Sequence, residues 1–301
     1  MKPSSKDSSQ PTAQAFTALP FLLPALIIYA VFAIYPIINA LILSFYDWDG
    51  VSENRNFVGF NNYLQIFTQD PVFWTAVKNS LIWVVLSLIV PTIVGLALAV
   101  AVNQKIFARN SFRAIFYLPS IIASIAVATI WSWMYNPLLG LFNTLLKSLG
   151  LGFLIQDWLG DPNVALYSIF IAYIWQSAGA TMVLFLAGLQ GVPEELKEAA
   201  RVDGANPWRV FWNVVLPSLR QTTIVVTVLT IINSLKVFDL IVGMTSGGPG
   251  QSTQVLALWS YTQSFGLRDF GNGMAVAMVL LALTLLIVIP YMMWVSRGSE
   301  E

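Results

Sequence analysis

The sequence predicts an all-α integral membrane protein with six transmembrane helices. Of its 301 residues, 57% are hydrophobic and 10% are charged, whereas soluble domains carry about 25% charged residues. The charges also leave long gaps, and each gap has room for the roughly 20 apolar residues that a helix needs to cross a bilayer core. Because lipid offers the backbone no hydrogen-bond partner, these apolar stretches are expected to be helical.

Six apolar stretches follow one another along the chain. Five lie in uninterrupted gaps between charged residues, and a sixth contains Lys236 and Asp239. The predicted spans cover about 18–45, 77–103, 114–136, 164–190, 221–243 and 271–296, each close to the length that crosses a bilayer. An even number of spans places both termini on the same side of the membrane.

The first stretch follows Lys2 and Lys6, as the apolar part of a secretory signal would. It is about twice as long as the 7 to 15 apolar residues of such a signal, so we expect it to remain as a span. Residues 1–15 are rich in Ser, Gln, Pro and Thr and are predicted to form a disordered cytoplasmic tail. The predicted division continues with a first helix and external segment over 16–75 and a transmembrane core over 76–297, which contains a polar loop over 191–219.

The placement of Lys and Arg predicts the orientation. Ten of the 15 basic residues lie in the tail, in the second and fourth connections and at the C-terminus, and five lie on the other side. Cytoplasmic loops carry the excess of positive charge. We therefore expect a multi-pass protein of the cell (inner) membrane with both termini and the 191–219 loop in the cytoplasm.

The composition excludes most catalytic chemistry. The sequence has no Cys and no His, which removes thiolate metal sites and the usual general base. It has no Gly-Lys-Ser/Thr and hence no P-loop, and no basic run typical of nucleic-acid binding. We expect no catalytic residue, metal or cofactor on this chain. A secondary transporter is the alternative, but it would need its own coupling-ion site, and Asp239 is the only acid within a predicted span.

The loop between the fourth and fifth spans predicts two short helices around a turn. Pro193 at a first helical position, Glu194 near the positive end of the helix dipole and Gly204 as a stop predict a first helix over about 193–203. Ala199 and Ala200 leave one side of this helix without bulk, so that another protein can approach its backbone. The alternative is an amphipathic helix that lies on lipid headgroups, and composition alone does not decide between them.

Three motifs in this loop resemble the signature loop of the permease subunits of binding-protein-dependent ABC importers. They are Glu198-Ala199-Ala200, Asp203-Gly204-Ala205 and Leu216-Pro217. Further motifs over nearly the whole chain, such as Tyr117-Leu118-Pro119 and Phe21-Leu22-Leu23-Pro24, are similar to the sugar permeases of the maltose and glycerol-phosphate type, which have the MetI-like fold. One departure is the first external loop, which is far shorter than the inserted domain of the enteric maltose subunit.

The resemblance implies a type I importer permease with a cytoplasmic coupling helix. It would pass a small sugar or sugar-like solute, such as an oligosaccharide, a glycoside or glycerol phosphate, delivered by an extracytoplasmic solute-binding protein. The implied partners are a second homologous permease, two cytoplasmic ATPase subunits that would bind ATP and Mg, the binding protein and membrane lipid. The residues implied to couple to the ATPase are Glu198, Ala199, Ala200, Asp203 and Gly204.

The same resemblance implies a substrate pathway lined by polar side chains of the spans. These are Ser120, Ser124, Tyr173, Gln176, Ser177 and Asn233. Polar groups inside a membrane usually face a partner or an aqueous path, although small residues such as the three serines also permit close helix packing. Lys236 has two interpretations: an ion pair with Asp239, three residues on along the same helix face, or hydrogen bonds to substrate hydroxyls.

Overall fold

The computed structural model describes residues 22–297, and the structural statements below refer to this part of the chain. The predicted tail over 1–15 lies outside the described residues. Four helices are long and apolar enough to cross a membrane: Leu22–Leu43, α4 (Pro71–Asn103), α8 (Ala165–Gln190) and α15 (Phe270–Arg297). The first of these contains a π-helical turn, η1 (Ala30–Ile34), and ends in α2 (Tyr35–Leu43). Two bent pairs of helices bring the candidate spans to as many as six.

The first bent pair replaces the straight third span that the sequence predicted over 114–136. α5 (Arg109–Tyr117) continues through the 3₁₀ turn η2 (Leu118–Ile121) and then turns by 99° into α6 (Ser124–Met134). Pro119 lies in the 3₁₀ turn, where it has no amide hydrogen to continue the α-helical ladder. The stretch over 114–136 thus lies in one of up to six candidate spans, but its bend was not predicted, because hydropathy records how apolar a stretch is and not its direction.

The second bent pair leads from the polar loop into the fifth crossing. α10 (Pro207–Val210), the π-helical turn η4 (Phe211–Val215) and α11 (Leu216–Ser218) turn by 66° into α12 (Arg220–Leu235). The predicted span over 221–243 is too long, because α12 ends at Leu235 and a separate helix, α13 (Asp239–Thr245), follows. Lys236 and Asp239 therefore do not share one helix.

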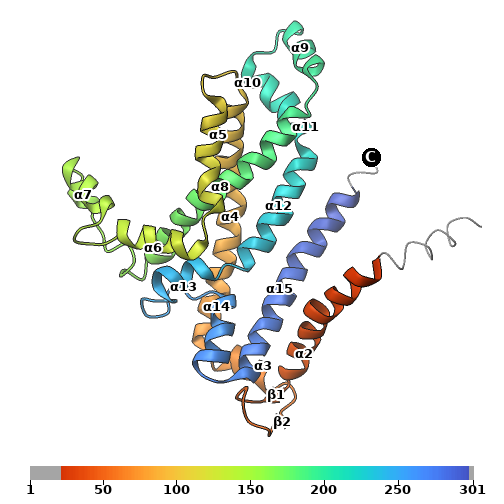
Figure 1. The fold of residues 1–301 in the computed structure, drawn as a ribbon, viewed down its shortest axis with the longest axis vertical. Coiled ribbons are helices and arrows are strands. Elements are labelled where there is room, and N and C mark those ends of the chain that lie inside the picture. Colours follow the sequence, from red (N-terminus) through yellow and green to blue (C-terminus); the bar gives the residue numbers. More distant parts are fainter. Residues whose placement is uncertain (1–21, 298–301) are drawn as a thin grey trace, which may run out of the picture.

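Shorter elements lie between the spans. α9 (Glu194–Val202), α10 and the connection between α4 and α5 gather at one end of the bundle, and α3 (Asn61–Thr68) and a small hairpin lie at the other (Figure 1). In the hairpin, β1 (Tyr46–Asp47) pairs antiparallel with β2 (Asn56–Phe57), a two-stranded addition to a fold predicted as all-α. The remaining elements are α7 (Leu141–Ser148), η3 (Gly152–Leu154), α14 (Leu256–Tyr261) and η5 (Thr262–Gly266).

Helix packing centres on α8, which runs against α4 and also contacts α12. Its buried side chains Ile169 and Phe170 contribute to one apolar cluster with Trp83 of α4, and Met182 and Phe185 contribute to a second with Ala99. α15 packs on α12 and α14 and supports the first span through α2. The first span is otherwise largely exposed, with an apolar surface suited to lipid.

Asp70 joins the start of α4 to the segment before α15. Its Oδ1 accepts hydrogen bonds from the backbone nitrogens of Val72 and Phe73 at 2.9 and 3.0 Å, which caps the helix. Its Oδ2 accepts from Trp259 Nε1 at 2.7 Å and from Gln263 Nε2 at 3.3 Å. Both oxygens of one carboxylate therefore hold two segments together that are far apart in the sequence.

We predict that Asp70→Ala lowers the free energy of unfolding by about 2 to 4 kcal/mol, because it removes a helix cap and leaves the indole N–H of a buried Trp259 unpaired. Thermal unfolding of the purified protein in detergent measures the effect. Glu53→Ala, which removes an exposed carboxylate on the same side of the bundle, is the matched control. Equal midpoints for the two variants would contradict this role of Asp70.

Candidate functional site

A cavity of about 320 Å³, which we call polar because most of its lining residues have polar side chains, lies between η2, α8 and α12. Five of the predicted pathway residues line it: Ser120, Tyr173, Gln176, Ser177 and Asn233. Its walls are completed by Thr181, Thr230 and the apolar residues Ala180, Leu184, Val226 and Leu229. The sequence reasoning missed Thr181 and Thr230. Each lies about one helical turn from a predicted residue, Ser177 or Asn233, and this spacing could have identified them.

Gln176 compensates for the break between η2 and α6. Its Nε2 donates to the carbonyl oxygen of Ile122 at 3.0 Å and to Ser124 Oγ at 3.2 Å. Ile122 is the residue at which the helix stops, so its carbonyl would otherwise lack a partner within the membrane. Ser124 does not line the cavity itself, but its hydroxyl accepts a hydrogen bond from Gln176, which does.

Two of the serines are engaged in backbone contacts. Ser120 Oγ donates to the carbonyl oxygen of Gln176 at 2.7 Å and accepts from the backbone nitrogen of Ala180 at 3.0 Å. Ser177 Oγ donates to the carbonyl of Tyr173 one turn earlier, at 2.7 Å. The close approach of the end of α5 to α8 also requires Gly179, where an added Cβ would lie 2.2 Å from the carbonyl oxygen of Phe116. The packing role that small residues commonly have in membranes thus applies to these serines.

Tyr173 and Asn233 face the cavity differently from the serines. The Tyr173 ring packs against Trp83 and Phe170, with centroids 5.3 and 5.7 Å apart, so its position is fixed by the helix core. Asn233 lies near the end of α12, is exposed, and its side chain makes no hydrogen bond within residues 22–297. Its amide can therefore offer both donors and an acceptor to a polar solute.

Lys236 does not lie where the sequence predicted. It caps the end of α12, is exposed and is not among the residues that line the cavity. The proposed ion pair with Asp239 is absent from the described residues, in which the two ion pairs join Glu194 to Lys197 and to Arg201. The helix break moves Asp239 to the first turn of α13, and the shared helix face on which the pairing depended does not exist.

The polar hairpin, residues 191–219, has the predicted shape of two short helices around a turn. α9 ends in a Schellman motif, in which Ala205 N donates to Ala200 O at 2.9 Å and Gly204 N to Arg201 O at 3.0 Å. Gly204 has φ +83°, a conformation that a residue with a Cβ rarely adopts. Asn206 then caps α10 by accepting from Arg209 N at 2.8 Å.

The hairpin is held firmly to the bundle, while α9 presents a free outer face. Val210, Val215 and Leu219 are buried in the same apolar cluster as Phe185 and Leu189 of α8. On the outer side of α9, Ala199 is exposed, as are the large apolar side chains of Leu196 (50%) and Val202 (88%). Exposed apolar side chains beside a small residue are suited to contact with another protein. Of the other predicted coupling residues, Glu198, Asp203 and Gly204 are exposed and Ala200 is half-buried.

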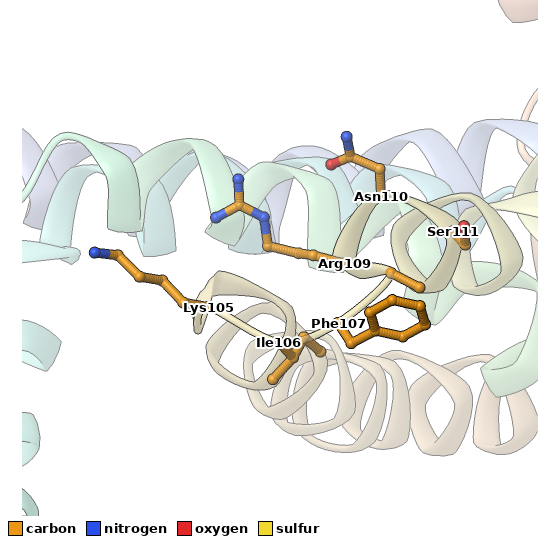
Figure 2. Close-up of a pocket in the computed structure, with 7 residues that line it drawn as sticks. Lys105, Ile106, Phe107, Arg109, Asn110 and Ser111 are labelled. Carbon is orange, nitrogen blue, oxygen red and sulfur yellow. The ribbon is translucent and has the colours of Figure 1, made fainter.

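The connection between α4 and α5 adds positive charge at the same end of the bundle. Figure 2 shows the side chains of Lys105 and Arg109 extending to the same side of this connection, away from Phe107. Phe107 is 96% exposed. A loop that exposes both basic and apolar side chains is typical of a membrane–water boundary.

These features define a class of protein: a multi-span membrane permease with a polar cavity among its helices and a rigidly attached hairpin at one end. Residues 92–295 match the family described as binding-protein-dependent transport system inner membrane component. The chain belongs to this family. The match contains the cavity, the hairpin and both bent spans.

Individual relatives are similar in sequence to this chain over nearly its whole length. A probable ABC transporter permease protein of Pyrococcus horikoshii is 39% identical, over 93% of this chain and 96% of its own. The trehalose/maltose transport system permease protein MalF of Thermococcus litoralis is 34% identical over 90% of each chain. In the crystal structure of a bacterial alginate ABC transporter in complex with alginate pentasaccharide-bound periplasmic protein, one chain has the same fold, with a TM-score of 0.79, 24% identity and coverage of 95% of this chain and 96% of that chain.

We predict that Gln176→Leu destabilises the protein by about 1 to 3 kcal/mol, because the Ile122 carbonyl then loses its donor inside the membrane. Thermal unfolding in detergent is the measurement. Gln190→Leu, an exposed amide at the end of the same helix, serves as the control and should leave the midpoint unchanged. If both variants unfold alike, Gln176 does not support the break.

Proposed function

We propose that this chain is a permease subunit of an ATP-driven importer and that it passes a sugar or sugar-like solute through the cavity between η2, α8 and α12. The observation that carries the proposal is the combination of that polar cavity with a protein-facing hairpin in one rigid unit. The trehalose/maltose relative supports a carbohydrate as the solute class. ATP hydrolysis would reside on separate subunits that bind ATP and Mg, since the sequence contains no P-loop.

The partners follow from the same proposal. The outer face of α9, with Glu198, Ala199, Ala200, Asp203 and Gly204, would seat on a cytoplasmic ATPase subunit. An extracytoplasmic binding protein would deliver the solute at the opposite end, as supported by the alginate transporter complex. A second, homologous permease would complete the pathway. Both termini would be cytoplasmic, because Lys and Arg are concentrated at the hairpin end.

Enlarging Ala199 tests the coupling role. In the assembled transporter, we expect Ala199→Trp to reduce solute-stimulated ATP hydrolysis and uptake by at least about tenfold, because a bulky indole prevents close approach to the partner. Ala199→Ser keeps a small side chain and should retain activity. Both assays are made in proteoliposomes that contain all subunits.

The coupling assignment would be lost if Ala199→Trp transported as fast as Ala199→Ser. Subunit stoichiometry after purification shows whether the complex still assembles. A complex that assembles but hydrolyses ATP without responding to solute is the expected outcome.

Asn233 tests the cavity. We expect Asn233→Leu to raise the KM for uptake by about tenfold, because one or two hydrogen bonds to the solute are removed. Thr227→Leu, on α12 but outside the cavity lining, should leave the KM unchanged. Uptake of a labelled sugar by vesicles with saturating binding protein measures the KM of both variants. Similar KM values for the two variants would contradict a role of the cavity in solute passage.

A further inference from the structure

A second and larger cavity lies under α9, formed by α4, the end of α8, α9 and the segment from α10 to η4. Its volume is about 850 Å³, and this groove is mainly apolar. The apolar residues include Ile93, Leu96, Val100, Leu189, Phe211 and Val215. None of them belongs to the polar cavity described above. The groove is therefore a separate site with different chemistry.

The mouth of the groove is basic and aromatic. Lys197 and Arg201 of α9 line it, together with Trp208 and Trp212. The two indole rings lie 5.5 Å apart and are 68% and 47% exposed as residues. Tryptophan and basic side chains gather where a membrane meets water, because the ring is amphipathic and the cation reaches the headgroups.

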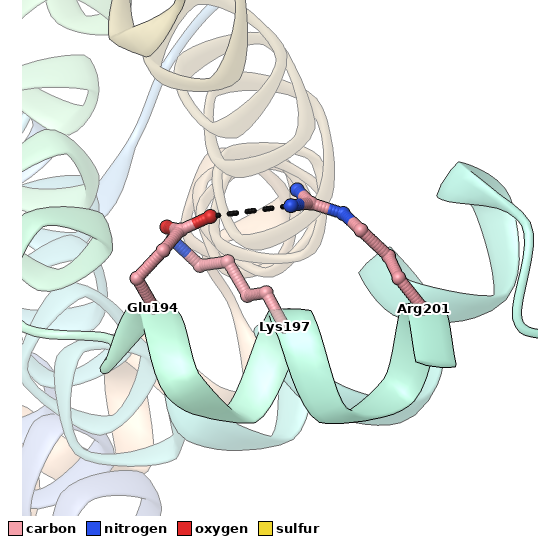
Figure 3. Close-up of polar contacts among 3 residues, drawn as sticks. All are labelled: Glu194, Lys197 and Arg201. Atoms are coloured by element: carbon pink, nitrogen blue, oxygen red, sulfur yellow. Dashed lines mark hydrogen bonds and ion pairs between the residues drawn. The ribbon is translucent and has the colours of Figure 1, made fainter. Parts of the chain in front are cut away.

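The lining of the groove contains two cations, Lys197 and Arg201, and no carboxylate. Figure 3 shows the side chains of both cations directed toward the Glu194 carboxylate, with Lys197 Nζ at 2.9 Å and Arg201 Nη1 at 3.4 Å from its oxygens. The hydrogen bond from Lys197, and then the charges of Lys197 and Arg201, lower the pKa of the Glu194 carboxyl, so it is ionised at neutral pH. Glu194 lies outside the groove lining and is exposed, as are Glu195 and Glu198 of the same helix. The charge that lines the groove is therefore positive, and it favours an anionic ligand.

The dimensions of the groove agree with those of one leaflet of a bilayer. The exposed apolar residues Val85, Ile89 and Ile93 follow one face of α4 and lead into the groove at Leu96 and Val100. From Ile93 to Asn103, the first and last α4 residues that line the groove, the helix rises about 15 Å at roughly 1.5 Å per residue. This is about half of a 30 Å hydrocarbon core, the depth that the acyl chain of one leaflet reaches.

We propose that the groove holds an anionic phospholipid, with an acyl chain along α4, its phosphate at Lys197 and Arg201, and the two tryptophans at headgroup level. An apolar helix of a partner subunit would fill the apolar part but would bring no anion to Lys197 and Arg201. A phospholipid satisfies both parts. The lipid would join the hairpin to α4 and so stiffen the base of α9.

Lipid retention by the complete transporter tests the proposal. The complex is reconstituted in an equimolar mixture of phosphatidylglycerol and phosphatidylcholine, extracted with mild detergent and analysed by native mass spectrometry. The wild type should retain phosphatidylglycerol in preference to phosphatidylcholine. Lys197→Gln/Arg201→Gln should reduce the retained phosphatidylglycerol by about tenfold or more, since each basic residue near an anionic headgroup contributes to its binding. Arg209→Gln, a cation of the same hairpin outside the groove lining, should not.

A second pair of variants tests the acyl chain. Ala97 lines the groove and is exposed, so Ala97→Trp should block the groove and reduce retention to a similar extent. Ala101→Trp, one turn along α4 and outside the groove lining, is the control and should retain lipid. Because intact subunit masses appear in the same spectra, loss of lipid is distinguished from loss of assembly. Should Ala97→Trp fail to assemble, a photoactivatable phosphatidylglycerol should crosslink to the wild-type peptide that contains Ile93–Val100.

Three results would overturn the proposal: no lipid retained by the wild type, equal retention of the two lipids, or crosslinks that avoid α4. The first would mean that a partner helix covers the groove. Retention is measured on the resting complex, without solute or ATP. Its failure would therefore not bear on the import function proposed above.

Discussion

The structure depends on one constraint: within a membrane, each backbone group that a helix does not pair must find another partner. The chain departs from continuous helix at the end of η2, inside its third crossing. There, Gln176 of α8 donates a hydrogen bond to the Ile122 carbonyl, which the helix leaves unpaired. Ser120 binds backbone atoms of α8 at the same place. The polar groups that permit the break thereby surround the cavity, so the cavity and the break have the same cause.

This constraint also explains why a polar cavity persists in an apolar bundle. Gln176 and Ser120 are held by hydrogen bonds and Tyr173 by Trp83 and Phe170, so their positions do not depend on a bound solute. Asn233, on the opposite wall, makes no such bond within the described residues. One wall of the cavity is therefore prearranged and the other is free to form hydrogen bonds.

Sequence reasoning predicted the apolar spans, the shape of the hairpin and five residues that share one cavity. The hairpin was predictable because Pro193, Gly204 and Asn206 each favour a specific local backbone geometry. The 99° bend was not predictable from hydropathy, since the chain stays apolar through Ile122 while its direction changes. Hydropathy likewise did not predict that α12 ends at Leu235. The error at Lys236 followed from this, because the predicted partner of its side chain required a helix that continued. Whether the coupling residues contact an ATPase stays a prediction.

The 66° bend between α11 and α12 joins the hairpin to the fifth crossing at a fixed place in the chain. Asn233 lies 13 residues beyond Arg220, about 20 Å along α12. Rotating α12 by about 10° about this bend would move Asn233 sideways by roughly 3.5 Å. This displacement is about as large as the distance between the donor and the acceptor of a hydrogen bond. If the function proposed above holds, a small rotation of the hairpin would be enough to make or break a hydrogen bond between Asn233 and the solute.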